Sequence, residues 1–168
     1  NAGRLFTFFG MIPNFAPQVI LPRLASLVRL GDCLLFSANL APGDDYAAGV
    51  QRILPLYDND LTRDWLMTFL LDLGVEVNDG ELRFTIEDDP DGSGLKRVAA
   101  HFWFTRGRDL RLDGDQVKFH AGESIRLFFS YRHTPALVKA LLAQHGLRVV
   151  DQWITQSGEE GVFLVSRG

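Results

Sequence analysis

The feature that most constrains the fold is an apolar stretch, rich in aromatic residues, near the start of the chain. Residues 4–9 read Arg-Leu-Phe-Thr-Phe-Phe, and turn-forming residues follow over 10–15. A continuous apolar run that ends in turn formers predicts a strand buried on both faces, as in parallel sheets. A helical pattern over 16–29 and a second apolar run over 33–37 come next. The sequence therefore predicts a strand–loop–helix–strand unit, with residues 10–15 at the rim of a small-molecule site beyond the strand ends.

Composition narrows the class of protein. The chain has 168 residues, of which 46% are hydrophobic and 23% charged, and this predicts a globular domain with a sizeable core. The net charge of −4 gives no support for a nucleic-acid surface, and no apolar run approaches the roughly 20 residues of a membrane helix. The single Cys33 rules out a disulfide framework within the chain and favours a reducing cytoplasm.

The order of patterns predicts an α/β chain interrupted by an antiparallel lobe. Asn1-Ala2 looks like the remnant of a cleaved tag, and a strand that starts directly after it predicts a fragment. Residues 3–45 predict a partial Rossmann-like sheet, and residues 46–133 an inserted lobe. Residues 134–168 predict a helix, capped by Thr134, and a closing hairpin.

The inserted lobe shows first a helical and then a strand period. Residues 46–73 predict two helices separated by Pro55, the second with Trp65, Leu66, Phe69 and Leu70 on one face and capped by Asn59 or Asp60. In the helix before the lobe, Pro22 is expected to cause a kink or to mark the first turn. Strands are predicted over 81–87, 96–105, 110–119 and 124–131, with turns at 88–94, Gly107, Asp113-Gly114 and Ala121-Gly122.

Few residues point to acid–base, covalent or metal chemistry. The four histidines fall at no compact ligand spacing, and the Asp-rich turn at 88–92 lacks the alternation of a calcium loop. Neither Ser37 nor Ser130 lies in a nucleophile elbow, and Cys33 is expected to be a core thiol. No catalytic residue or metal ligand is therefore predicted. Methyl transfer from a sulfonium fits this inventory, because it depends mostly on aligning donor and acceptor in a dry pocket.

Four short motifs resemble one family, the histidine-specific, S-adenosylmethionine-dependent methyltransferases, whose type member trimethylates histidine in ergothioneine biosynthesis. In chain order the motifs are Ile12-Pro13-Asn14-Phe15, Leu30-Gly31-Asp32-Cys33-Leu34-Leu35, Tyr57-Asp58-Asn59 and Gly122-Glu123-Ser124-Ile125-Arg126. The chain is similar only to the C-terminal half of that family. The resemblance implies the C-terminal half of a class I, Rossmann-like methyltransferase sheet with an inserted antiparallel α+β substrate lobe.

The resemblance also implies roles for single residues. Asn14 and Tyr57 are expected to hold the amino and carboxylate ends of an amino-acid-like substrate. Gly10, Met11 and Phe15 are expected to border S-adenosylmethionine, although Gly10 is out of register with the family's glycine. The alternatives stay open at this point, since Asn14 is also a common turn residue and Tyr57 could be an aromatic residue of a surface loop.

The chain departs from the family where the acceptor's side chain would bind. Phe128 stands where the family has a glutamate that grips imidazole, and Ala100 stands where it has a methionine, while Ser130 matches. A ring cannot pair with imidazole as a carboxylate does. We therefore expect the acceptor to be an amine or amino acid that is more apolar than histidine. Plain core packing is the alternative role for Phe128.

The resemblance places the glycine-rich loop and the ribose-binding acid of the family outside this chain. Residues 1–168 are then expected to bind S-adenosylmethionine weakly or not at all and to be inactive alone. An unpaired strand edge also predicts a homodimer or a domain-swapped pair built through Phe6–Phe9. Two other functions remain: a non-catalytic binding module derived from the same fold, and an unrelated α+β ligand-binding domain. The methyltransferase hypothesis requires the last strand to run antiparallel beside the second.

Overall fold

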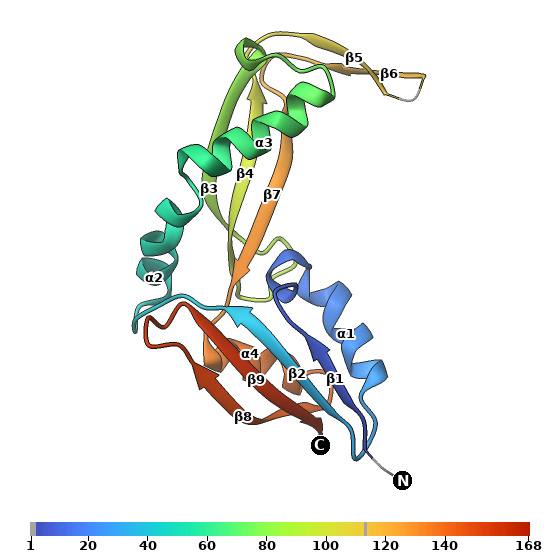
Figure 1. Ribbon diagram of the computed structural model, residues 1–168, viewed down its shortest axis with the longest axis vertical. Coiled ribbons are helices and arrows are strands. Elements are labelled where there is room, and N and C mark those ends of the chain that lie inside the picture. The colour runs from blue at the N-terminus through green and yellow to red at the C-terminus, as the bar shows by residue number, and fades with distance from the viewer. Residues whose placement is uncertain (1–2, 113) are drawn as a thin grey trace. The chain divides into compact units, whose positions relative to one another are not determined.

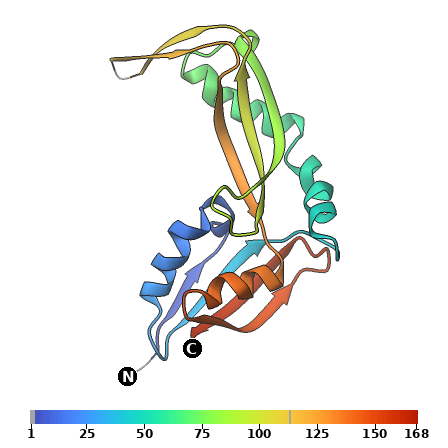
Figure 2. The same ribbon diagram turned by 180° about the vertical axis from the view of Figure 1, so that it is seen from behind.

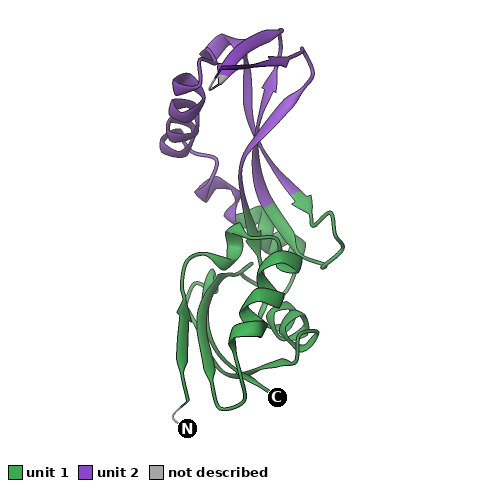
Figure 3. Cartoon of the chain, turned by 90° about the vertical axis from the view of Figure 1, so that its right-hand side faces the viewer, with its two compact units in different colours: residues 1–52, 87–97, 130–168 green, residues 53–86, 98–129 purple. Residues whose placement is uncertain are grey.

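A computed structural model describes residues 3–112 and 114–168 of the chain, so the predicted tag remnant and Asp113 of one predicted turn lie outside the described residues. The chain forms two compact units (Figure 3). Unit 1 contains residues 1–52, 87–97 and 130–168, and unit 2 contains residues 53–86 and 98–129. This division differs from the sequence-based boundaries, because residues 46–52, 87–97 and 130–133 fall in unit 1.

Unit 1 is built on a four-stranded sheet in the order β1-β2-β9-β8 (Figure 1). The strands are β1 (Leu5–Phe8), β2 (Cys33–Asn39), β8 (Leu147–Ile154) and β9 (Glu160–Arg167). β1 and β2 are parallel, whereas β9 runs antiparallel to both β2 and β8. The last strand therefore lies antiparallel beside the second, as the methyltransferase hypothesis requires.

Helices α1 (Pro17–Leu27) and α4 (Pro135–Ala143) lie on one face of this sheet (Figure 2). Their apolar sides, with Phe36 of β2 and Phe163 of β9, form the core of unit 1, and these two rings stack with centroids 5.4 Å apart. Pro22 lies in the interior of α1, so it does not mark the first turn of the helix. α4 begins as predicted, because the Thr134 side chain accepts a hydrogen bond from Leu137 N at 3.1 Å. A further helix, α2 (Tyr46–Ile53), follows β2.

The predicted burial of the first strand on both faces is wrong. Leu5 and Thr7 are exposed and Phe6 and Phe8 only half-buried, and Phe9, just after the strand, is exposed. Among the described residues β1 pairs with β2 alone, so one edge of the strand has no neighbour. The apolar character of the run was read correctly, but the sequence of one strand does not say how many neighbours it has.

Unit 2 is built on a three-stranded sheet in the order β3-β4-β7 and a two-stranded hairpin, β5-β6. Most of each strand of the larger sheet belongs to this unit, and the remainder is counted with unit 1. Helix α3 begins after Asn59, whose side chain accepts a hydrogen bond from Thr62 N at 3.1 Å. Short 3₁₀ turns occupy Ile12–Asn14 in unit 1 and Leu54–Leu56 and Val77–Asp79 here. The larger elements are α3 (Asp60–Asp72), β3 (Gly80–Asp88), β4 (Lys96–Phe104), β5 (Arg108–Leu112), β6 (Asp115–Phe119) and β7 (Ser124–Arg132).

The core of unit 2 lies between α3 and the sheet. Leu70 of α3 packs there with Phe102 and Phe104 of β4. The sequence predicted one apolar face made of Trp65, Leu66, Phe69 and Leu70. Only the two leucines of this set are buried. Trp65 and Phe69 are exposed and lie on the adjacent side of the helix, about 100° around its axis from the two leucines.

The connection into β2 is fixed by Asp32. Its carboxylate accepts hydrogen bonds from Arg4 N at 2.9 Å, from the Arg4 guanidinium at 2.6 Å and from Arg29 N at 3.0 Å. These bonds hold the pKa of Asp32 well below the usual range of a carboxyl. Gly31 directly precedes it with φ of +87°, a backbone conformation that favours glycine. The Gly-Asp motif thus ties the end of α1 to the starts of both parallel strands.

We expect Asp32→Asn to lower the melting temperature by a few degrees at neutral pH, because the neutral amide loses the ionic bonds to Arg4. The folded-state pKa lies below the unfolded one, so this stabilisation is present above about pH 4 and is lost as the pH falls. Thermal melts of both proteins between neutral and acidic pH should therefore converge on acidification. Asp44→Asn, at an exposed aspartate, is the control. A difference that is constant with pH would contradict the role given to the charge.

Candidate functional site

One group of predicted site residues lies in unit 1 at the carboxyl ends of β1 and β2. Gly10 has φ of +70°, and its N–H donates a hydrogen bond to Ser37 Oγ at 2.9 Å. The turn after β1 is therefore tied to the end of β2. This edge is where ligands bind in open sheets with parallel strands.

Asn14 is exposed on the 3₁₀ turn that follows β1. The turn is fixed by a hydrogen bond from Asn14 N to Met11 O at 2.9 Å and by the burial of Ile12. The Met11 side chain is exposed, and Phe15 contacts Phe8 with ring centroids 6.2 Å apart. At the end of the strand, two apolar side chains, Met11 and Phe15, thus form a rim beside the side-chain amide of Asn14.

Ser130 belongs to the same unit and is buried near the end of β7. The side-chain amide of Asn39 donates a hydrogen bond to Ser130 Oγ at 3.3 Å. Asn39 is the last residue of β2, and sequence reasoning missed it as part of the site. Its position offered a signal, because a polar residue that closes an apolar strand lies at the ligand-binding edge of the sheet.

His133 lies buried beside these groups. The backbone N–H of His133 donates a hydrogen bond to Asn39 O, and its backbone carbonyl accepts one from Ala41 N, both at 2.9 Å. Burial lowers the pKa of His133 to about 4, so the imidazole is neutral at neutral pH. Its imidazole helps to line a small void with Ile12 and Phe15 of the turn after β1. His133 therefore supports both the end of β2 and the turn that carries Asn14.

A second group of predicted site residues lies in unit 2. The rings of Tyr57 and Phe128 contact each other, with centroids 5.5 Å apart and an angle of 35° between their planes. Both side chains are half-buried. Ala100 is fully buried in β4. Because successive side chains of a strand point to alternate faces, Ala100 lies on the same face of β4 as Phe102, which packs in the core.

The loop that carries Tyr57 is held by its two neighbours. The carboxylate of Asp58 pairs with the Arg63 guanidinium at 2.6 Å, and this guanidinium also donates to Leu82 O at 3.0 Å. The side-chain amide of Asn59 donates to Leu56 O at 2.8 Å. The position of Tyr57 is therefore set by the start of α3 and by β3, and the ring of Phe128 packs against it.

The turn between β3 and β4 is ordered by a buried polar network in unit 1. The Tyr131 hydroxyl donates to Asp89 at 2.6 Å and accepts from Arg97 at 3.3 Å. Burial and the bond to Asp89 raise the pKa of Tyr131 to about 12. Burial also acts to raise the pKa of Asp89, but hydrogen bonds from Ser93 and Tyr131 bring it below its usual value. The predicted turn is present, but Asp89 is a buried anchor of it.

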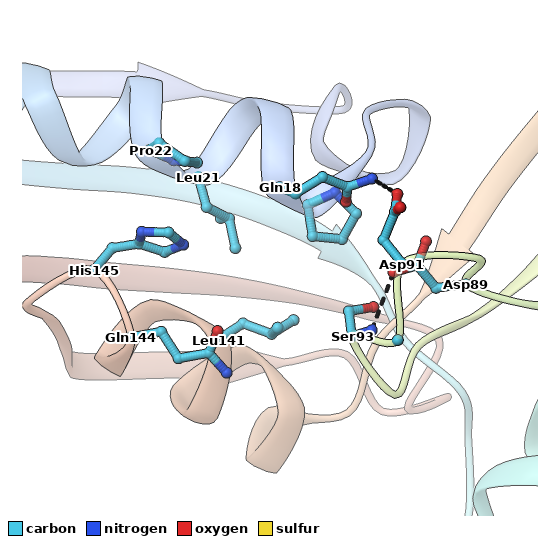
Figure 4. A pocket seen from close by; sticks show the side chains of 11 residues that line it. Gln18, Leu21, Pro22, Asp89, Asp91, Ser93, Leu141, Gln144 and His145 are labelled. Carbon is cyan, nitrogen blue, oxygen red and sulfur yellow. Dashed lines mark hydrogen bonds between the residues drawn. The ribbon is translucent and has the colours of Figure 1, made fainter.

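A pocket of about 280 Å³ lies between α1, α4 and the β3–β4 turn, and Figure 4 shows the side chains that line it. The Gln18 amide donates to Asp91 across its mouth, and Ser93 N donates to Asp89 at 3.1 Å. Leu21, Leu141 and His145 line the rest of it. None of the residues predicted to bind the acceptor or the donor lines this pocket.

Over residues 3–112 and 114–168, no group of three or more histidine, cysteine or acidic side chains is placed to hold a metal ion. In that same part of the chain, no helix combines the length and the apolar character needed to cross a membrane.

Comparison with known proteins gives the family resemblance independent support. Residues 91–167 match the family model described as histidine-specific methyltransferase, SAM-dependent. The histidine N-alpha-methyltransferase of Mycobacterium tuberculosis (strain CDC 1551 / Oshkosh) is 29% identical over 183 residues, an alignment that covers 98% of this chain and 52% of that protein. This chain is similar to the C-terminal half of the histidine-specific methyltransferases. It spans about half the length of this curated relative.

Solved structures of methyltransferases align over nearly the whole chain. An S-adenosylmethionine-dependent methyltransferase from Clostridium acetobutylicum ATCC 824 gives a TM-score of 0.45 at 12% identity, covering 100% of this chain and 61% of that one. The glycopeptide N-methyltransferase MtfA complexed with S-adenosylmethionine gives 0.37 at 11% identity, covering 98% and 56%. The fold assignment depends on the strand order and directions in unit 1, which agree with the expected α/β methyltransferase sheet.

The predicted donor-binding residues fit one side of an S-adenosylmethionine site. Met11 and Phe15 present apolar groups that suit the face of an adenine ring, and Gly10 adds no side chain to the space beside them. The Gly10 N–H is already bonded to Ser37 Oγ and so contributes to the turn. These three residues would hold the donor only together with polar groups from elsewhere.

We expect the Asn39–Ser130 hydrogen bond to be measurable in a double-mutant cycle. Asn39→Ala and Ser130→Ala should each destabilise unit 1 by about 1 kcal/mol, and the double variant by less than the sum, because they remove the same bond. Urea denaturation of the wild type and the three variants gives the coupling energy. Additive effects would show that the two side chains do not support each other.

Proposed function

We propose that this chain is the acceptor-facing part of an S-adenosylmethionine-dependent methyltransferase that acts on an amine or amino-acid-like small molecule other than histidine. The contact between Tyr57 and Phe128 carries this proposal. It puts an aromatic ring, in place of the family's glutamate, next to the tyrosine expected to hold the substrate's backbone.

The chemistry of Phe128 argues against histidine as acceptor. An imidazole buried against an apolar ring loses hydrogen bonds to water and gains none in return, which costs about 1–3 kcal/mol for each unpaired group. An aliphatic or aromatic side chain gains from the same surface. Phe128 should therefore favour an acceptor whose amino and carboxylate groups are bound by polar residues and whose side chain is apolar.

The residues of this chain have modest roles in such a reaction. When bound, S-adenosylmethionine supplies a methyl group on a sulfonium, which is already an activated leaving group. Within unit 2, Tyr57 would orient the acceptor amine, and the Tyr57–Phe128 pair would exclude water. Alignment in a dry site is the main source of rate enhancement here, so the lack of a predicted general base fits the proposal.

Two surfaces of unit 1 support a donor-binding portion outside these 168 residues. Among the described residues one edge of β1 is unpaired, with Leu5 and Phe9 exposed, and such an edge favours pairing with a further strand. On the sheet face opposite α1 and α4, the cross-strand pair Leu35–Leu164 is only half-buried. Sheets with parallel strands usually bury both faces. Pairing with a second copy through Phe6–Phe9 is the other use of the same edge, and we propose it for these 168 residues expressed alone.

The acceptor can be tested by calorimetric titration of the protein made from its whole reading frame. With S-adenosylhomocysteine present, we expect phenylalanine or leucine to bind at least about tenfold more tightly than histidine, a difference of about 1.4 kcal/mol. Phe128→Glu should reverse this preference by restoring a partner for imidazole. Trp153→Glu, at an exposed aromatic residue of β8, is the matched control. Tight histidine binding by the unaltered protein would refute the proposed acceptor class.

The donor can be tested by comparing the whole reading-frame product with residues 1–168. We expect the longer protein to bind S-adenosylmethionine at micromolar concentration and the shorter one at least about a hundredfold more weakly, because Gly10, Met11 and Phe15 form only one side of the site. Equilibrium dialysis with labelled S-adenosylmethionine measures both. A longer protein that does not bind the donor would instead support the non-catalytic binding module.

A further inference from the structure

The outer face of α3 carries three large apolar side chains in one row. Leu61, Trp65 and Phe69 are 84%, 65% and 56% exposed, and they follow one another at intervals of four residues. On a helix this spacing puts side chains one above another along a single ridge. The adjacent face of the helix, with Leu66 and Leu70, is already buried. We call Leu61, Trp65 and Phe69 the α3 stripe.

The α3 stripe is larger than the scattered apolar residues of an ordinary surface. Single exposed leucines need no explanation, but a contiguous row that includes tryptophan and phenylalanine indicates a binding surface. Aromatic residues carry much of the binding energy at protein interfaces. The α3 stripe extends over two helical turns, or about 12 Å from Leu61 to Phe69.

Acidic residues border the α3 stripe. Asp64 and Asp72 are exposed at the positions three residues after Leu61 and Phe69, which places them on the same side of the helix. In the part of the chain that the structure describes, neither carboxylate has a cation within salt-bridge distance, unlike Asp58 beside Arg63. The apolar ridge thus has an uncompensated negative rim.

We propose that the α3 stripe docks a basic amphipathic helix of a partner polypeptide. A ridge of side chains four residues apart fits the groove of another helix, and lysine or arginine beside the partner's apolar residues would pair with Asp64 and Asp72. A second copy of α3 would bring like charges together at the same rim. The anionic surface of a lipid membrane would be repelled for the same reason.

This interaction does not depend on which reaction the protein takes part in, so it is tested without substrate or methyl donor. The probe is a fluorescein-labelled peptide of about four helical turns, with leucine and lysine at amphipathic spacing. A second peptide has glutamate at every lysine position. Fluorescence anisotropy measures the binding of each peptide to the 168-residue chain at low and at physiological salt.

We expect the lysine peptide to bind and the glutamate peptide to bind at least about tenfold more weakly. Trp65→Ala with Phe69→Ala should weaken binding of the lysine peptide by about tenfold or more. Asp64→Lys with Asp72→Lys should weaken the lysine peptide and strengthen the glutamate peptide. Val150→Ala with Trp153→Ala is the matched control, because these side chains are 53% and 52% exposed on β8. It should change binding by less than about twofold.

Three results would overturn the proposal. The first is equal binding of the two peptides, and the second is an equal loss of binding in the α3 and β8 double variants. The third is self-association in sedimentation velocity that Trp65→Ala with Phe69→Ala abolishes, which would assign the α3 stripe to a second copy. Substitution of exposed residues should leave the fold intact, and circular dichroism melts of each variant verify this.

Discussion

The rest of unit 1 depends on the hydrogen bonds that join Leu40, at the end of β2, to two distant segments of the chain. Leu40 N donates to Glu159 O at 2.7 Å, and the buried Arg132 guanidinium donates to Leu40 O at 3.0 Å and to Glu159 O at 3.3 Å. Leu40 and His133 also form an isolated parallel β-bridge. Three chain segments that are far apart in sequence thus meet where β2 ends and β9 begins. Because β9 must start there, it can enter the sheet only antiparallel to β2.

This junction also explains why the predicted residues of unit 1 gather at one edge. The end of β2 holds the turn after β1 through Ser37 and Gly10, and it holds β7 through Asn39 and Ser130. The polar groups of the site are therefore consequences of how the sheet closes. Sequence reasoning could name Gly10 and Ser130 from a resemblance, but the hydrogen bonds that join them to β2 depend on tertiary contacts between distant segments.

Features decided within a few residues of the sequence were predicted well, whereas features that depend on tertiary contacts were not. Thr134 and Asn59 cap their helices as the sequence indicates, because a cap is decided within one turn. The burial of the first strand was wrong, since its apolar sequence does not specify the number of paired strands. The buried side of α3 was not predicted either. Trp65 and Leu66 are equally apolar, so hydrophobicity alone could not separate the covered side of the helix from the exposed one.

In the motifs that resemble the methyltransferase family, several residues serve mainly to stabilise the fold. Asp32 ties α1 to the sheet, Asn59 caps α3, and Glu123 accepts a hydrogen bond from His120 N at 2.8 Å in the turn before β7. Shared residues of this kind specify a fold and say little about the acceptor. The proposed acceptor depends instead on the side chains around Tyr57, among them Phe128, whose ring contacts the tyrosine ring. The evidence for the fold and the argument for the proposed acceptor therefore come from different residues, so a chain that resembles the family in its fold need not share the family's acceptor.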